Sequence, residues 1–195
     1  MMHYFARFEP FKEELFRFDT RIYLSDRPDS GEGRCIAAIV GKNPGSATSG
    51  DLNKLVPIDL NGDKMLPTVR NRFLQAYATA DKAIPDGAFI RVWNLFYLCE
   101  PDLKIACQKI RTLEELPVCA TEQSPAPMLW FGWGGTDVRL NPFKQRFLRN
   151  KSARAFYYDH HMAKVIAEKP TAEGFAKHTQ GMPAQPVSEF ISTLL

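Results

Sequence analysis

The sequence contains no hydrophobic run long enough to cross a bilayer and no apolar signal segment at its beginning. A membrane helix needs about 20 mostly apolar residues, and a secretory signal needs an apolar stretch behind a basic one. The first residues instead alternate charged and aromatic side chains. We therefore expect a protein that is neither secreted nor inserted in a membrane, and the cytoplasm is its simplest location.

Cysteine is scarce, and its spacing does not suit metal binding. None of the four cysteines belongs to a Cys-x-x-Cys pair, so neither a zinc site nor an iron–sulfur site is expected. Small core residues in a reducing compartment are the better interpretation of Cys35, Cys99, Cys107 and Cys119.

Histidine is also rare, and one pair of histidines is a candidate for a functional site. His160 and His161 follow Asp159 at the end of a predicted strand, where a metal or an acid–base site is one interpretation. Neighbouring strand residues point to opposite faces, so only one of the two can join a given site. No third ligand stands at a suitable spacing, and we expect no metal and no cofactor.

Acidic residues are missing from one segment of the chain, residues 138–158. It carries six basic residues and no acid, and the aromatic residues Phe143, Phe147, Phe156 and Tyr157 are interleaved with them. Such a segment suits a nucleic acid, because cations neutralise phosphates and aromatic rings stack on bases. A solvated helix face with its Phe side chains in the core is the alternative. The candidates for nucleic-acid contact are Lys144, Arg146, Arg149 and Lys151.

Length and composition indicate one globular domain over residues 1–195. Of the 195 residues, 45% are hydrophobic and 24% are charged, which is ordinary for a chain that buries one substantial core. We expect the core to begin at about residue 34, after an N-terminal helical extension over residues 1–33. A helix over residues 10–18 places Phe11, Leu15 and Phe18 on one face.

Strand and helix patterns alternate along the remaining chain. Short apolar runs predict strands over residues 34–40, 89–98, 128–132 and 153–158. Helices are expected over residues 67–80, 102–116, 141–149 and 188–195, the last capped by Ser188. This order predicts an α/β fold, a three-layer αβα sandwich with a four-stranded, mostly parallel central sheet. Residues 49–66 read as a long loop, of the kind that often forms a lid or a binding loop.

The first predicted strand ends in a loop of small and polar residues, Gly41-Lys42-Asn43-Pro44-Gly45-Ser46. Small residues at a strand end allow backbone N–H groups to approach a ligand, and ligands bind beyond the carboxyl ends of parallel strands. A plain tight turn is the alternative, because Asn-Pro and Pro-Gly are common turn formers.

Several separated motifs resemble the mismatch-specific uracil/thymine-DNA glycosylases of the uracil-DNA glycosylase superfamily. The strand followed by G-x-N-P-G at residues 41–45 is similar to their first active-site motif, and residues 67–74 (PTVRNRFL) are similar to their P-x-N-R-F-W segment. Residues 181–188 (GMPAQPVS) stand where that family has a loop of N-P-S or H-P-S type.

A closer resemblance is to an uncharacterised bacterial and phage family with N-P-S-T-A, D-P-T-x-x-R, N-L-F and P-R-H-P-L motifs. Residues 43–47, 67–70, 94–96 and 183–187 carry it, in the same order along the chain. The last motif departs from the pattern, because Ala184 and Gln185 replace its Arg and His.

The resemblance implies hydrolysis of the bond between a flipped uracil-like or modified base and its sugar. It implies that Asn43 positions the attacking water, and that the site includes Gly41, Lys42, Pro44, Gly45, Ser46, Asn71, Arg72, Asn94 and Gln185. Arg70 is a candidate phosphate contact. DNA, single-stranded or duplex, is the implied partner. A non-catalytic module that binds nucleic acid or nucleotides on the same fold is the alternative, and an enzyme acting on free nucleosides or nucleotides is a third.

Overall fold

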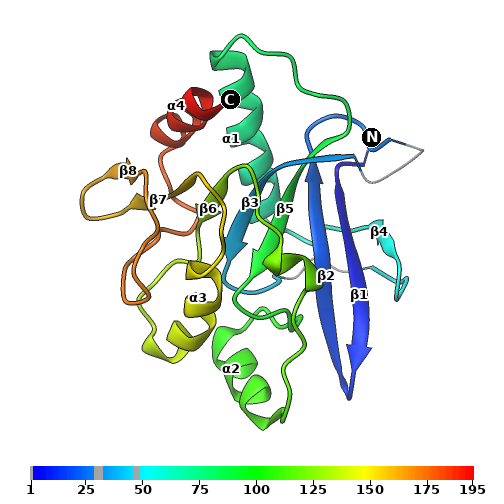
Figure 1. Cartoon of the computed structure of the whole chain (residues 1–195). Helices are drawn as coiled ribbons and strands as arrows, with labels where there is room; N and C mark the ends of the chain where they lie inside the picture. The colour runs from blue at the N-terminus through cyan, green and yellow to red at the C-terminus, as the bar shows by residue number, and fades with distance from the viewer. Residues whose placement is uncertain (1, 29–32, 46–48) are drawn as a thin grey trace.

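The computed structural model describes residues 2–28, 33–45 and 49–195, and its centre is one mixed sheet of eight strands (Figure 1). Their order across the sheet is β4-β1-β2-β5-β3-β6-β7-β8. The strands are β1 (Tyr4–Phe11), β2 (Glu14–Tyr23), β3 (Arg34–Gly41), β4 (Leu55–Pro57), β5 (Ala88–Asn94), β6 (Leu129–Phe131), β7 (Ala155–Asp159) and β8 (Lys164–Ile166).

The four strands expected from the apolar runs lie side by side as β5-β3-β6-β7, and each neighbouring pair is parallel. The predicted four-stranded sheet is nevertheless too small. Antiparallel strands extend the parallel block on both sides, with β2, β1 and β4 beyond β5 and with β8 beyond β7. The α/β class is therefore confirmed, while the sheet is mixed and has twice the expected number of strands.

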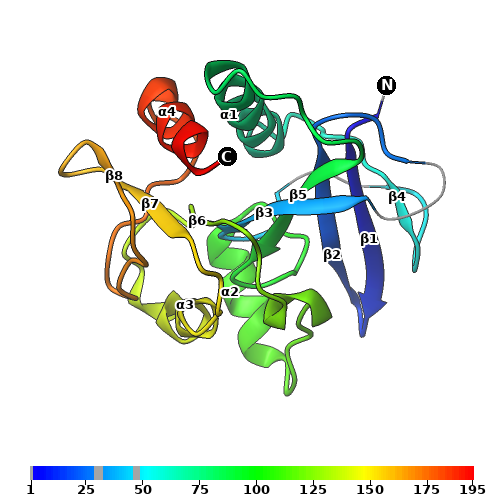
Figure 2. The ribbon, with the colours of Figure 1, turned by 45° about the horizontal axis from the view of Figure 1, so that its top comes forward.

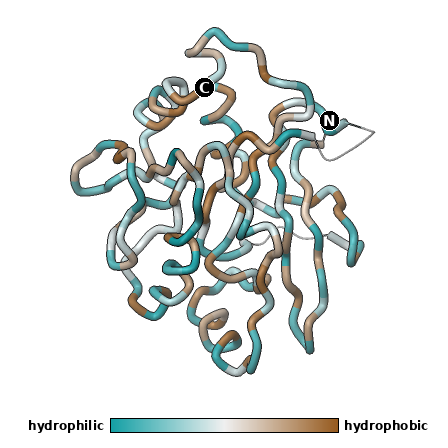
Figure 3. The backbone as a smooth tube through the Cα atoms, viewed as in Figure 1, coloured by the Kyte–Doolittle hydropathy of each residue, from teal (hydrophilic) through white to brown (hydrophobic). Residues whose placement is uncertain are grey.

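The predicted helix over residues 10–18 is wrong, and so is the helical character of the extension over residues 1–33. Residues 4–23 form the β1–β2 hairpin, which turns at Lys12 with a φ of 55°. Three of the four residues at the tip, Lys12, Glu13 and Glu14, are charged, and the tip is hydrophilic in Figure 3. The hairpin joins the central block through the antiparallel pairing of β2 with β5.

A bulge at Asp19 explains why β2 lacks a regular alternation in the sequence. Asp19 has a φ of 46°, and the pairing with β1 shifts around it. An extra residue on one strand moves the following side chains to the opposite face. Phe16 and Phe18 therefore face one side of the sheet, while Ile22, which regular alternation would place with them, packs in the core on the other side.

Helices cover both faces of the sheet (Figure 2). On one face, α1 (Met65–Thr79) and α4 (Ala184–Leu194) bury Val69, Phe73 and Ile191 against the strands. On the other face, α2 (Leu103–Thr112) and α3 (Asn141–Leu148) bury Ile110 and Phe147. Two short 3₁₀ turns, Ala120–Gln123 and Val138–Leu140, precede β6 and α3. No helix in the described ranges is long and apolar enough to cross a membrane.

The helix ends follow ordinary capping chemistry in one case and depart from the expectation in another. The Asp102 carboxylate accepts hydrogen bonds from Lys104 N and Ile105 N, at 2.8 and 3.0 Å, and so caps α2 as an N-cap residue should. Ser188 does not cap the last helix, because α4 already begins at Ala184. Pro186 is tolerated there, since the N–H groups of a first helical turn have no partner within the helix.

Candidate functional site

The carboxyl ends of β3 and β5 meet at one edge of the sheet. Gly41 and Asn94 pair as the last residues of these two parallel strands. A Cβ on Gly41 would lie 2.9 Å from the Asn94 Oδ1 and 2.9 Å from the Met65 Cε. Glycine is therefore required for the two side chains to approach this strand end. Asn94 is fully buried, and neither atom of its amide has a hydrogen-bond partner within the described residues.

Asn43 follows two residues after this strand end and is half-buried. Its amide Nδ2 donates to the Glu100 carbonyl at 2.7 Å. This hydrogen bond fixes which way the amide faces, because only the nitrogen end can donate to a carbonyl. The oxygen end of the amide is left as an acceptor, and Asn43 lines a cavity of about 280 Å³.

Asp63 lines the same cavity and is held at the start of α1. Its Oδ1 accepts hydrogen bonds from Met65 N at 2.8 Å and Leu66 N at 3.3 Å. Its other oxygen, Oδ2, lies 3.4 Å from the position that a Cβ on Gly45 would take. One oxygen therefore caps the helix, and the other faces the loop that carries Asn43.

His178 is the third polar side chain of the cavity. The segment that carries it is placed by two backbone hydrogen bonds, Gly134 N to Ala176 O at 2.7 Å and Lys177 N to Tyr158 O at 3.0 Å. Gly134 has a φ of 63°, and a Cβ on it would lie 2.9 Å from the His178 Cβ. A side chain at position 134 would thus displace the imidazole.

The imidazole is neutral and its tautomer is set by the backbone. The His178 Nδ1 accepts a hydrogen bond from Gln180 N at 3.2 Å, so the proton of the neutral ring is on Nε2. Burial lowers the pKa of His178, and the positive charge of Lys42 lowers it further, while Asp63 acts in the opposite direction. The ring can therefore donate one hydrogen bond from Nε2 at neutral pH.

A second cavity of about 470 Å³ shares Gly62, Lys64 and Gln180 with the first. Arg72 lines it from α1, where its Nη1 donates to the Gln75 Oε1 at 3.2 Å and its buried Nε has no partner among the described residues. The two cavities together form a groove that begins at Asn43 and His178 and ends at Arg72.

Lys42 follows Gly41 at the same edge but does not line the first cavity. It is half-buried, and its Nζ lies 3.9 Å from the position of a Cβ on Gly135. Burial lowers the pKa of Lys42, and Asp137 partly opposes this effect. The ammonium group forms no ion pair with any residue of the described ranges, and it acts on the cavity through its charge on His178.

The structure brings together part of the predicted site. Asn43 and Gly45 line the first cavity, Arg72 lines the second, and Gly41 and Asn94 lie directly behind. Pro44 is buried beside them, and Ser46 lies outside the described residues. Asn71 is exposed on α1 and lines neither of these cavities, and Gln185 bonds Glu189 on α4 at 2.8 Å, away from the groove.

Most of the cations expected to contact nucleic acid are bound within the fold. Arg70 donates to the carbonyls of Tyr23 and Leu24, both at 3.0 Å. Lys144 is fully buried, and its Nζ donates to the Ala172 carbonyl at 2.7 Å.

Arg146 is also internal, with its Nη2 2.9 Å from the Leu95 carbonyl and its Nε 2.6 Å from the Glu122 carboxylate. The cations of Lys144 and Arg146 therefore do not form the solvated helix face of the alternative interpretation, although Phe147 packs in the core as that interpretation expects. Arg149 and Lys151 remain exposed.

Sequence reasoning missed Asp63 and His178 as site residues. Asp63 belongs to the long loop over residues 49–66, which was expected as a lid or binding loop and which also contains the short strand β4. His178 stands seven residues before Gln185, the position at which the resemblance leads one to expect a histidine. The sequence does show a histidine close to the late loop. It does not show which edge of the sheet that histidine reaches.

His160 and His161 do not converge with these residues. Both rings lie against Phe175, with centroid distances of 5.6 and 6.1 Å. Within the described ranges, no group of three or more His, Cys, Asp or Glu side chains is arranged to hold a metal ion.

No family model, no curated protein and no solved structure matches this chain.

Proposed function

We propose that the protein is a DNA glycosylase, which hydrolyses the N-glycosidic bond of a flipped uracil-like or modified base. The observation that carries this proposal is the fixed amide of Asn43, whose nitrogen donates to the Glu100 carbonyl. Asp63 and His178 line the same cavity. The motif resemblance at residues 41–45 supports the same assignment.

The three polar groups match the charges that develop during base release. The reaction passes through a cationic sugar while negative charge builds on the departing base. Asn43 accepts a hydrogen bond from the attacking water through its amide oxygen. Asp63 supplies a carboxylate that stabilises the sugar cation and receives the proton of the water. His178 donates from Nε2 to the base oxygen on which negative charge accumulates.

The neighbouring cavity suits the backbone beside the extruded nucleotide. Lys64 and Arg72 are the cations of this part of the groove, and a phosphate placed there would be held by both. The base would enter the cavity lined by Asn43, while the sugar and phosphate follow the groove towards α1. Unstacking a base costs a few kcal/mol, which such phosphate contacts would offset.

Base release from labelled oligonucleotides tests the proposal. Duplex and single-stranded substrates with uracil, mismatched thymine or modified pyrimidines are incubated with the protein and then treated with alkali, which cleaves abasic sites. We expect release that Asn43→Ala lowers by about 100- to 1000-fold, the scale for one preorganised polar group. Asn71→Ala is the matched control, because Asn71 is exposed and lines neither cavity of the groove.

Further variants separate the three roles. Asp63→Asn keeps an oxygen that can cap α1 but removes the charge, and we expect it to lower base release without unfolding the protein. Asn43→Asp removes the donor to the Glu100 carbonyl and adds a negative charge, so release that persists in this variant would show that a carboxylate at position 43 can activate the water. Release that is unaltered in Asn43→Ala would remove Asn43 from the mechanism.

A non-catalytic module that binds nucleotides is the second candidate function. The observation in its favour is that Lys144 and Arg146 are held inside the fold, which leaves fewer cations for a long DNA backbone. Saturable binding of a nucleotide or oligonucleotide, with no alkali-labile product from any of the substrates, would favour this candidate.

A further inference from the structure

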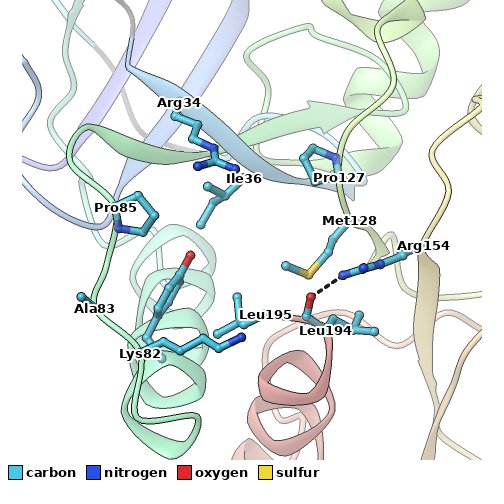
Figure 4. A pocket seen from close by; sticks show the side chains of 11 residues that line it. Arg34, Ile36, Lys82, Ala83, Pro85, Pro127, Met128, Arg154, Leu194 and Leu195 are labelled. Atoms are coloured by element: carbon cyan, nitrogen blue, oxygen red, sulfur yellow. Dashed lines mark hydrogen bonds between the residues drawn. The ribbon is translucent and has the colours of Figure 1, made fainter.

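A separate cavity of about 310 Å³ lies at the opposite edge of the sheet (Figure 4). Arg34 begins β3, Met128 immediately precedes β6, and Arg154 immediately precedes β7, so this edge carries the amino ends of the parallel strands. The end of α1 and the end of α4 close the cavity, through Tyr77 and Leu194 among others. It is therefore distinct from the groove that contains Asn43.

The floor of this cavity is apolar. Ile36, Tyr77 and Met128 are each less than 10% exposed and line it from β3, α1 and the start of β6. Pro85 and Pro127 form its sides in Figure 4. A ligand that fills the cavity must therefore present an apolar part to this floor.

The rim of the cavity is cationic. Arg34, Lys82 and Arg154 line the cavity from three segments of the chain, with Arg34 on the side of β3 and Lys82 on the side of α1, and no Asp or Glu side chain lines it within the described ranges (Figure 4). Arg154 donates to the Leu194 carbonyl. Arg34 and Lys82 have no side-chain hydrogen bond or ion pair with any described residue, which leaves two positive charges without a partner.

Tyr77 adds a polar group beside these charges. Burial raises the pKa of Tyr77, and the positive charge of Arg34 opposes this effect, so the two groups are close enough to interact. The hydroxyl is therefore protonated at neutral pH and is a further donor for an anion.

We propose that this cavity binds a small organic phosphate monoester, towards whose phosphate the exposed side chains of Arg34 and Lys82 turn from opposite sides, and whose apolar part lies on Ile36 and Met128. A monoester carries a charge of about −1.5 to −2 at neutral pH, which matches two cations that have no partner among the described residues. Arginine can hold two of its oxygens at once, and lysine adds a point charge. The volume admits little more than the phosphate and one small ring, which favours a free small molecule over a polymer.

Titration calorimetry with phenyl phosphate tests the site, with inorganic phosphate and phenol as the two partial ligands. We expect phenyl phosphate to bind at least about ten times more tightly than either, because only it uses both the rim and the floor. Arg34→Gln or Lys82→Gln should each weaken binding about tenfold, as expected for one hydrogen bond to a charged group. Both side chains are exposed, so the fold should be retained, and circular dichroism checks this.

Lys151→Gln is the matched control, since it removes an exposed lysine that does not line the cavity. If Lys151→Gln weakens phenyl phosphate binding as much as Arg34→Gln and Lys82→Gln do, the binding reflects only the net charge of the protein, and the proposal is overturned. Absence of saturable phenyl phosphate binding would overturn it as well. Asn43→Ala should leave this binding unchanged, so the result is independent of base release.

Discussion

At the residue scale, the charge state of His178 depends on two neighbours of opposite sign. Lys42 lowers the pKa of the imidazole and Asp63 raises it, while burial is the largest influence and lowers it. We expect an NMR titration to give a pKa below 6.5, the ordinary histidine value, and to show the Nε2-protonated tautomer. Lys42→Gln should raise this pKa, and Lys151→Gln should leave it unchanged. A pKa that falls in Lys42→Gln would contradict the geometry of the site.

The same residue links pH to stability. Because the pKa of His178 is lower in the folded protein, the unfolded chain binds the proton first as the pH falls through about 6.5. The free energy of unfolding should therefore decrease below that pH. Part of this decrease should be absent in His178→Gln, and denaturant unfolding at pH 7.5 and pH 5.5 measures the difference.

Gly41 is the residue at which the packing behind the site is tightest. An added Cβ would lie 2.9 Å from both the Asn94 Oδ1 and the Met65 Cε. We expect Gly41→Ala to lower the free energy of unfolding by about 1 to 3 kcal/mol, the usual cost of overpacking. Gly50→Ala is the control, because nothing lies within 4 Å of its Cβ position. Equal stability of the two variants would show that the Gly41 environment can relax.

At the scale of elements, the cations of α3 and its C-terminal end differ in burial. Lys144 is fully buried with its Nζ on the Ala172 carbonyl, while Arg149, at the end of the helix, is exposed. We expect Lys144→Glu to cost more than about 3 kcal/mol of stability, because it places an uncompensated charge in the interior. Arg149→Glu should change stability by less than about 0.5 kcal/mol. Thermal and denaturant unfolding of the two variants tests this, and similar losses in both would contradict the observed burial.

Sequence patterns predicted a strand correctly where a single property, such as burial on both faces, determines the residue types. The parallel strands β3 and β5 are short apolar runs that are buried on both faces, so composition alone identifies them. The β1–β2 hairpin was missed because the bulge at Asp19 breaks the two-residue alternation, and the remaining spacing of Phe11, Leu15 and Phe18 imitates a helix.

The candidate site was predictable in part, for the same kind of reason. Asn43 stands two residues after the end of β3, so its position at the carboxyl edge follows from the sequence. Asp63 and His178 reach that edge from loops, and only tertiary contacts such as Gly134 N to Ala176 O determine where those loops lie. Likewise, no sequence pattern distinguishes the buried Lys144 from the exposed Arg149.

At the scale of the whole molecule, two of the cavities in the part of the chain that the structure describes carry cations that an outside anion can reach. One is the groove with Lys64 and Arg72, and the other is the edge with Arg34 and Lys82. They lie at opposite ends of the parallel strands, so a change in one should not alter the other. Arg149 and Lys151 form a smaller exposed pair beyond the end of α3.

This exposed pair allows a quantitative test of DNA binding. If both side chains contact phosphates, the double variant Arg149→Gln/Lys151→Gln should reduce the slope of log affinity against log salt by up to about 2. The control variant Lys104→Gln/Lys164→Gln removes the same charge from exposed positions elsewhere. Gel-shift titrations at several salt concentrations give the slope. Equal slopes in both variants would exclude residues 149–151 from the interface.

The intrinsic fluorescence of the three tryptophans reports on the core of the protein. Trp93, Trp130 and Trp133 are each at most 1% exposed, and they lie on β5, on β6 and just beyond β6. Their emission should therefore be blue-shifted in the native state and should move to longer wavelength on unfolding. Trp93 adjoins Asn94, and Trp133 adjoins Gly134, which packs against His178. A ligand that enters the groove should thus change the emission without any attached dye.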